Sequence, residues 1–150
     1  MNHELPELDI QRAKFIGESI LPLVEERIRL GLLSLKVVHS ATNKLVKQGD
    51  RRLNECLGEP EVLRTYVLAA ITELTELLQE LDWKPWRERE KPVDRDKVAE
   101  EFADVLAFIG VIITILVEHG ISVTQLTEAY IRKEHINVQR FLQASEKKQG

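Results

Sequence analysis

The segments Glu73-Leu-Thr-Glu76 and Glu101-Phe-Ala-Asp104 decide how this chain folds, because each sets two acidic side chains inside an apolar, helix-like stretch. Residues three positions apart share one face of an α-helix, so each pair points its carboxylates the same way. Two facing helices would gather all four into one cluster, where the charges repel strongly unless a cation neutralises them. The pattern therefore predicts packed helices that hold a hard divalent ion, Mg²⁺ or Mn²⁺, through oxygen ligands.

The composition of the chain is that of a globular protein rather than of a nucleic-acid binder. Its 150 residues are 43% hydrophobic, 31% charged and only 5% aromatic, which favours a single helical domain over 1–150. The net charge of −4 argues against a general nucleic-acid binder but allows one nucleotide bound through a metal. Cys56 is the single cysteine, so the chain forms no internal disulfide, and no Cys/His cluster indicates zinc.

The most apolar run, Val105 to Val117, covers 13 positions, fewer than the roughly 20 that a membrane-spanning helix needs. The acidic N-terminus lacks the pattern of a secretory signal, so the expected location is the cytoplasm. Because the run is apolar nearly all round, it is expected to be buried on several sides. A chain of this length achieves that most easily as a homodimer or homotetramer.

Four long helices are predicted, which makes the protein an all-α bundle of four to five helices. The first covers about 9–47, with Pro22 as a point where it can break. The second starts near Pro60 and runs to about residue 82. A short stretch at 51–57 is left open as a fifth element.

Capping signals mark the ends of the last two helices. Asp94 is a suitable N-cap for a helix that ends near residue 119, and Gly120 is placed to terminate it. Ser122-Val-Thr-Gln125 fits a capping box that opens a last helix to about Ala144, after which the polar tail is expected to fray.

The order of the acidic motifs resembles that of the all-α NTP pyrophosphohydrolases, the superfamily of MazG-like proteins and dimeric dUTPases. The gap from Glu76 to Glu101 is of the length seen there, and the motif-bearing part of the chain spans about 60–144. The acidic helix runs into Trp83-Lys-Pro-Trp86, similar to the aromatic-Lys-x-Trp element of dimeric dUTPases. The resemblance implies a metal-dependent enzyme that cleaves a nucleoside triphosphate between the α- and β-phosphates, giving a monophosphate and pyrophosphate.

The resemblance also implies roles for individual residues. Glu73, Glu76, Glu101 and Asp104 would hold the metal, and Glu73 or Glu76 would activate the attacking water. On the last helix, Tyr130, Lys133, Asn137 and Arg140 resemble the Tyr-x-x-Lys, Asn, Arg pattern of dimeric dUTPases and would bind phosphates. Their offsets of 3, 4 and 3 place them on one helix face. Candidates for the base and sugar are His39, Asn43, Trp83 and Trp86.

Several alternatives stay open. The Gly-Tyr ending that usually follows the arginine is missing after Arg140, so a MazG-like house-cleaning pyrophosphatase acting on dCTP or modified nucleotides competes with a dUTPase. A non-enzymatic helical oligomerisation or binding module is a further rival. A di-iron bundle is disfavoured because neither acidic pair carries the histidine that such sites use. Glu100 is either a fifth carboxylate of the site or a surface residue, and Glu80, Glu88 and Glu90 are expected on solvated helix faces.

Overall fold

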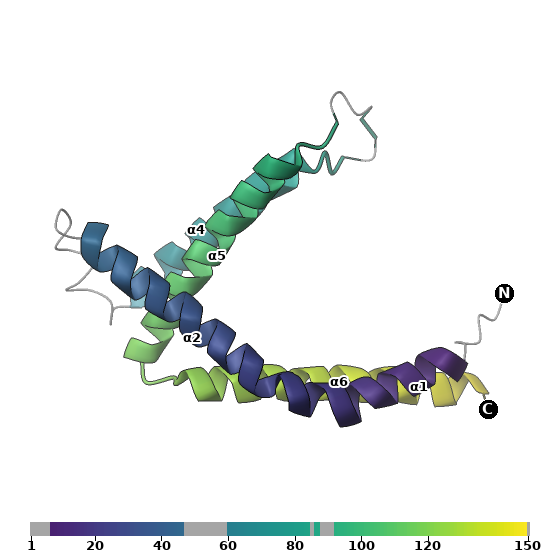
Figure 1. The fold of residues 1–150 in the computed structure, drawn as a ribbon. Coiled ribbons are helices and arrows are strands. Elements are labelled where there is room, and N and C mark those ends of the chain that lie inside the picture. The colour runs from purple at the N-terminus through teal and green to yellow at the C-terminus, as the bar shows by residue number, and fades with distance from the viewer. Residues whose placement is uncertain (1–6, 47–59, 85, 88–91, 150) are drawn as a thin grey trace. The chain divides into compact units, whose positions relative to one another are not determined.

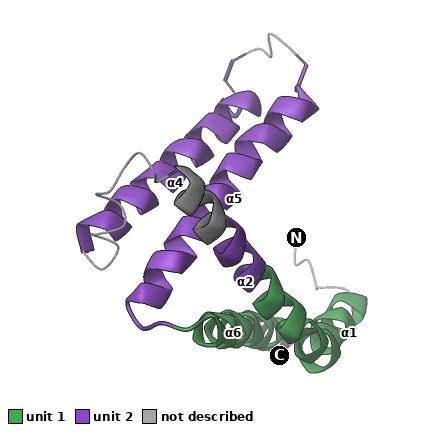
Figure 2. Ribbon diagram, turned by 60° about the vertical axis from the view of Figure 1, so that its left-hand side comes forward, with its two compact units in different colours: residues 1–31, 122–150 green, residues 32–121 purple. Residues whose placement is uncertain are grey.

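The computed structural model describes residues 7–46, 60–84, 86–87 and 92–149, and the side chains of these ranges except those of 39–46, 146 and 148–149. Within these ranges all regular structure is helical, which confirms the all-α class. The order is α1 (Glu7–Phe15), the π-helical turn η1 (Ile16–Ile20), α2 (Leu21–Val46), α4 (Pro60–Glu80), α5 (Arg95–Glu118) and α6 (Val123–Gln149) (Figure 1). Two compact units divide the chain: unit 1 is Met1–Gly31 with Ser122–Gly150, and unit 2 is Leu32–Ile121 (Figure 2). The predicted stretch at 51–57 lies outside the described residues.

The first helical region continues through Pro22 instead of breaking there. The five residues Ile16–Ile20 form a widened π turn, and the backbone N–H of Leu21 donates to the carbonyl of Ile16. Proline has no N–H to donate and its ring crowds the carbonyl four residues earlier, so a wider turn before Pro22 accommodates it without ending the helix.

Unit 1 is built by packing α1 and η1 along α6. Gly17 in η1 is buried, and a Cβ added there would lie 3.2 Å from Cγ1 of Val138 on α6. A larger residue at this position would therefore require Val138 to shift by a few tenths of an ångström, whereas glycine lets the wide turn lie close against α6. The hydroxyls of Thr127 and Ser145, both buried, donate to backbone carbonyls of their own helix.

In unit 2, α4 and α5 pack against each other as an antiparallel hairpin, and Figures 1 and 2 show them side by side, joined at one end by the segment 81–94. Each helix turns one row of side chains towards the other. Successive residues of this row, which we call the seam, lie four, three, four and three positions apart in the sequence. The seam of α4 is Tyr66, Ala70, Glu73, Leu77 and Glu80, and that of α5 is Glu101, Val105, Phe108, Ile112 and Ile115. All ten are buried or half-buried, and the rings of Tyr66 and Phe108 meet with centroids 6.1 Å apart.

The predicted helix ends at both sides of Gly120 are confirmed. Asp94 caps α5 by accepting from the N–H groups of Asp96 and Lys97. At the other end Gly120 has φ +84°, with Gly120 N–H donating to Val117 and Ile121 N–H to Leu116, which is a Schellman motif. Ser122 and Gln125 exchange reciprocal hydrogen bonds of 2.8 and 3.1 Å, as a capping box does.

The C-terminal helix is longer than predicted. It continues to Gln149, so the expected frayed tail from Ser145 was wrong for residues 145–149. Ser145 turns its hydroxyl inward to the carbonyl of Phe141, and the residues that follow include strong helix formers with lysines near the C-terminal end of the helix dipole.

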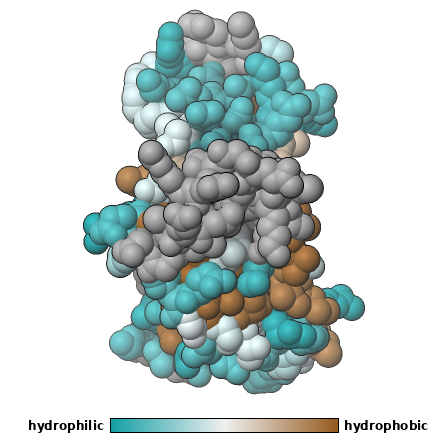
Figure 3. Space-filling model, turned by 90° about the vertical axis from the view of Figure 1, so that its left-hand side faces the viewer, coloured by the Kyte–Doolittle hydropathy of each residue, from teal (hydrophilic) through white to brown (hydrophobic). Residues whose placement is uncertain are grey.

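Among the described helices, none is by itself long and apolar enough to cross a membrane. Large hydrophobic side chains nevertheless reach the surface, from Leu23 on α2 (73% exposed) to Leu68 on α4 (63%). The face drawn in Figure 3 shows such hydrophobic patches between hydrophilic ones.

Candidate metal centre

The hairpin of α4 and α5 brings together carboxylates from both helices, namely three of the four that the sequence predicts in one cluster. Glu73 from α4 and Glu101 and Asp104 from α5 each offer a ligand oxygen, and these oxygens all lie within 4.8 Å of one another. Glu73 and Glu101 are half-buried because they occupy seam positions, whereas Asp104 lies one turn further along α5 and is exposed. The cluster is thus open on one side and enclosed by the helices on the other.

Three carboxylate oxygens at this spacing fit a hard divalent cation. Oxygens bound to one Mg²⁺ at 2.0–2.1 Å stand about 3–4 Å from one another, so only small side-chain rotations separate this group from a coordinating geometry. The exposed side of the cluster leaves room for the waters and phosphate oxygens that Mg²⁺ usually keeps as its other ligands.

The pKa values of the clustered carboxylates also favour a bound cation. The pKa of Glu73 is raised, first by the partial burial of the carboxylate and then by the charges of Glu76, Asp104 and Glu101. No cationic side chain of the described residues contributes to this shift or to that of Glu101. The cluster therefore holds excess negative charge that a cation would neutralise.

Glu101 is the carboxylate on which the largest number of neighbouring acidic residues act. Its pKa is raised by partial burial, followed in order by the charges of Glu76, Asp104, Glu80 and Glu100. Glu76 lies outside the three-oxygen group and is exposed, yet its charge acts on both half-buried carboxylates. Its position suits a group that contacts water beside an ion.

Glu80 is the contributor that the sequence analysis missed. It was expected on a solvated face, but it occupies the seam of α4, is half-buried and raises the pKa of Glu101. The signal was in the spacing, since Glu80 follows Glu73 by seven residues and Glu76 by four, which are same-face offsets. Glu100 also acts on Glu101, while Glu88 and Glu90 lie outside the described residues.

The residues predicted to bind phosphates lie on α6, in unit 1. Tyr130, Lys133, Asn137 and Arg140 are all exposed, on a face of α6 that differs from the one packed on α1 and η1. The structure thus confirms that they share an accessible helix face. Their position relative to the carboxylates of unit 2 stays a prediction.

The two tryptophans lie beyond the end of α4. Their rings meet edge to face with centroids 5.9 Å apart, and Nζ of Lys84 lies 5.6 Å from the centroid of the Trp83 ring. Trp83 lines a cavity of about 410 Å³ together with Thr75, Leu78, Gln79, Asp82, Lys84 and Arg87. On α4 these positions point away from α5, so the cavity and the carboxylates lie on different sides of the helix.

Of the two residues on the first helix that are proposed to contact the nucleotide base, the structure describes the backbone but not the side chains. Residues 39 and 43 lie one turn apart within α2, as predicted. The side chains of His39 and Asn43 lie outside the described residues, so their role stays a prediction.

A comparison with protein families supplies an independent finding. The family model described as dUTPase matches residues 42–114. The match contains both acidic pairs and the loop between their helices, and it ends before α6 begins. No curated protein and no solved structure matches the chain.

Proposed function

We propose, on the premise that the segment 42–114 belongs to the dUTPase family of all-α NTP pyrophosphohydrolases, that this protein cleaves a nucleoside triphosphate between its α- and β-phosphates. The products are a nucleoside monophosphate and pyrophosphate, and the preferred substrate is dUTP or a related pyrimidine deoxynucleotide. The proposal rests on the observation that carboxylate oxygens of Glu73, Glu101 and Asp104, all within the matched segment, lie close together.

In this proposal Glu73, Glu76, Glu101 and Asp104 hold Mg²⁺, with Mn²⁺ as a substitute. A bound divalent ion polarises phosphoryl oxygens and lowers the pKa of water. Glu76, which is exposed and outside the three-oxygen group, orients the attacking water and accepts its proton. The water oxygen bonds to the α-phosphorus, the bond from that phosphorus to the bridging oxygen breaks, and pyrophosphate leaves with the electron pair.

The substrate's phosphates are assigned to the exposed face of α6. Lys133 and Arg140 supply positive donors, and Asn137 and Tyr130 supply neutral ones. His39, Asn43, Trp83 and Trp86 remain the candidates for contact with base and sugar. An assembly of two or four copies is proposed as well.

Pyrophosphate release from a panel of nucleotides that includes dUTP, dCTP and the ribonucleotides tests this reaction, with Mg²⁺ and with EDTA. Monophosphate and pyrophosphate should form only with the metal. In H₂¹⁸O the label should enter the monophosphate, because water attacks the α-phosphorus. Label in pyrophosphate, or release of orthophosphate, would show that the cleavage position is wrong.

The same panel separates the dUTPase from the broader house-cleaning enzyme that the missing Gly-Tyr ending keeps open. Strong preference for dUTP supports the first, and similar rates for dCTP or modified nucleotides support the second. If no nucleotide turns over with Mg²⁺ or Mn²⁺, the non-enzymatic binding module takes their place.

Changing Arg140 to alanine should lower kcat/KM by roughly 10–100-fold, because a charge-assisted bond to phosphate is worth about 1.5–3 kcal/mol. Steady-state kinetics with the preferred nucleotide measure this. The matched control is Arg132→Ala, an exposed arginine on α6 away from the proposed face, which should leave kcat/KM within about twofold. Equal losses in the two variants would contradict the assignment of the α6 face.

A further inference from the structure

A cavity of about 410 Å³ lies on the outer side of α4, at the point where the chain leaves the helix. The helix contributes Thr75, Leu78 and Gln79 to its lining. Thr75 follows the seam residue Glu73 by two positions, which turns its side chain roughly 200° around the helix from the seam. The cavity is therefore separate from the acidic centre, which lies on the side of α4 that faces α5.

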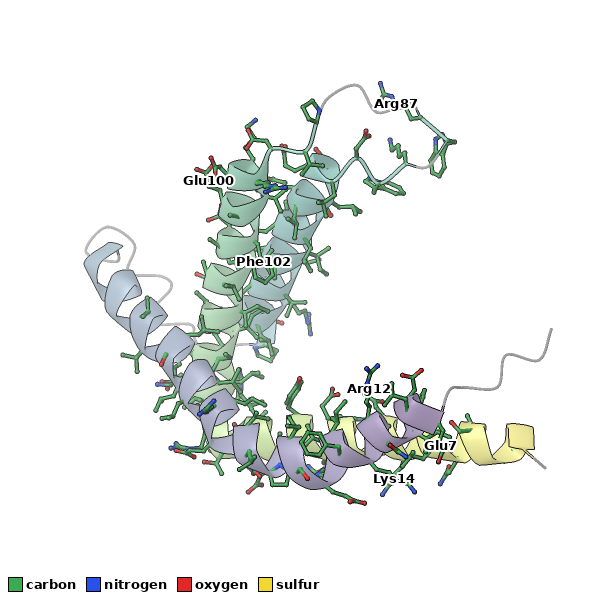
Figure 4. The ribbon with its side chains drawn as sticks, turned by 45° about the vertical axis from the view of Figure 1, so that its right-hand side comes forward. Glu7, Arg12, Lys14, Arg87, Glu100 and Phe102 are labelled. Atoms are coloured by element: carbon green, nitrogen blue, oxygen red, sulfur yellow. The ribbon has the colours of Figure 1, made fainter. Side chains whose placement is uncertain are left out.

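The backbone after α4 brings two cationic side chains to this cavity. Asp82 ends the helical turn with φ +50° and redirects the chain; among the described residues it is the only one besides glycine with a positive φ. The N–H of Arg87 then donates to the carbonyl of Lys84 at 3.2 Å, which closes a turn that places these two residues close together. Both line the cavity, and Figure 4 shows Arg87 on the connection beyond the ends of α4 and α5.

Trp83 adds an aromatic ring to the same lining and is 47% exposed. The ring of Trp86 meets it edge to face, with centroids 5.9 Å apart, and Nζ of Lys84 lies 5.6 Å from the centroid of the Trp83 ring. An aromatic surface and a cation thus border one space. A planar ring that carries an anionic group fits both, because the ring stacks on the indole while the anion pairs with the ammonium.

We propose that this cavity binds a nucleoside monophosphate, at a site separate from the acidic centre. The base stacks on Trp83, and the amide of Gln79 hydrogen-bonds its polar edge. The phosphate pairs with Lys84 and Arg87. Trp83, a candidate for the base of the substrate, then contacts the base of this second ligand instead. The volume of the cavity lies towards the lower end of the roughly 300–1,000 Å³ of small-molecule sites, which suits a single mononucleotide.

The charges of the lining favour a monophosphate over a metal-bound triphosphate. Asp82 is the only carboxylate among the lining residues, so the cavity has no group of carboxylates to hold the divalent ion that accompanies a triphosphate. A phosphate monoester carries about −1.5 to −2 charges at pH 7, which Lys84 and Arg87 match. The ligand should therefore bind without metal. The proposed reaction enters here only in the choice of a uracil nucleotide as the probe.

The fluorescence of the full chain tests this site directly, because Trp83 and Trp86 are the only tryptophans. In EDTA, dUMP should quench it saturably below about 1 mM, and the Glu73→Gln chain should bind dUMP with the affinity of the wild type. Deoxyuridine and inorganic phosphate should each bind at least roughly 10-fold more weakly, since each leaves half of the lining unpaired.

Two outcomes of this titration would overturn the proposal. One is a fluorescence that dUMP leaves unchanged. The other is quenching that requires Mg²⁺ and disappears in Glu73→Gln, which would place the nucleotide at the acidic centre. In EDTA, dUTP should bind more weakly than dUMP, because the lining has no cations for its further phosphates; tighter binding of dUTP would contradict the choice of a monophosphate. Because no turnover is measured, these results are independent of whether the proposed reaction occurs.

Isothermal titration calorimetry of variants identifies the residues that hold the phosphate. Lys84→Gln and Arg87→Ala should each weaken dUMP binding by roughly 10-fold, because each removes a charge-assisted bond. Both residues are exposed and lie beyond the end of α4, so the helices are expected to stay intact. The matched control is Arg64→Ala, an exposed arginine near the opposite end of α4, which should bind within about twofold of the wild type. Unchanged affinity in both cation variants, or an equal loss in the control, would overturn the assignment.

Discussion

Glu73→Gln should abolish pyrophosphate release, with kcat falling on the order of 10³-fold, while the far-ultraviolet circular dichroism stays that of the wild type. Glu73 is one of the three carboxylates whose oxygens lie within 4.8 Å of one another, so its loss removes a ligand from the proposed centre. Glutamine keeps the size of the side chain and leaves the helix seam packed.

The same substitution should raise the melting temperature of the metal-free protein. Partial burial, followed by the charges of neighbouring carboxylates, raises the pKa of Glu73 and disfavours its ionised form, and a neutral amide removes both costs. Glu118→Gln, at an exposed position near the end of α5, is the matched control and should change neither activity nor melting temperature. A Glu73→Gln variant that still turns over at the wild-type rate would remove the carboxylate cluster from the mechanism.

Mg²⁺ or Mn²⁺ should raise the melting temperature by about 5–10 °C at a hundredfold excess over its dissociation constant. Binding to the folded state alone contributes about 2.7 kcal/mol at that excess, and a chain of this size gains about 2–4 °C per kcal/mol. Differential scanning calorimetry with Mg²⁺ and with EDTA, at matched ionic strength, measures the shift. Asp104→Asn should lose most of it.

The rise in melting temperature that the metal causes should also grow with pH. Glu73 and Glu101 have pKa values above the ordinary 4.5, so the folded state holds more protons than the unfolded state just above that pH. The metal-free protein therefore loses stability as pH rises through the raised values, whereas the metal binds the deprotonated carboxylates and gains affinity over the same range. A shift that is the same at pH 5 and at pH 7.5, or one that Asp104→Asn retains, would contradict binding at this cluster.

Local signals in the sequence predict the helices well, and they predict that carboxylates of α4 and α5 lie close together, because both features depend on residues close together in the chain. Asp94, Gly120 and the pair Ser122 and Gln125 act on the backbone within one turn, so the ends they predict agree with the structure. The spacing of the acidic pairs places their side chains on one face before any tertiary contact is known.

The features that the sequence did not reveal depend on contacts far along the chain. Pro22 does not end the first helical region because η1 widens before it, where Gly17 lies against Val138 of α6. Glu80 belongs to the acidic centre because the hairpin turns its seam position towards Glu101. The relation of Arg140 and its neighbours to the carboxylates is set by how the two units assemble, which no local pattern encodes.

The π turn at Ile16–Ile20 has a consequence for how this protein can change in evolution. A π turn accommodates one more residue than an α turn, so it behaves as a single-residue insertion absorbed within a continuous helix. Deleting one residue there would restore an ordinary α-helix and leave α1 and α2 in their present register, whereas a deletion elsewhere in the helix would rotate everything before it by about 100°. After a deletion in the π turn, helix α1 would keep the same side chains towards α6. A one-residue deletion should therefore be better tolerated in this turn than in the regular α-helix on either side of it.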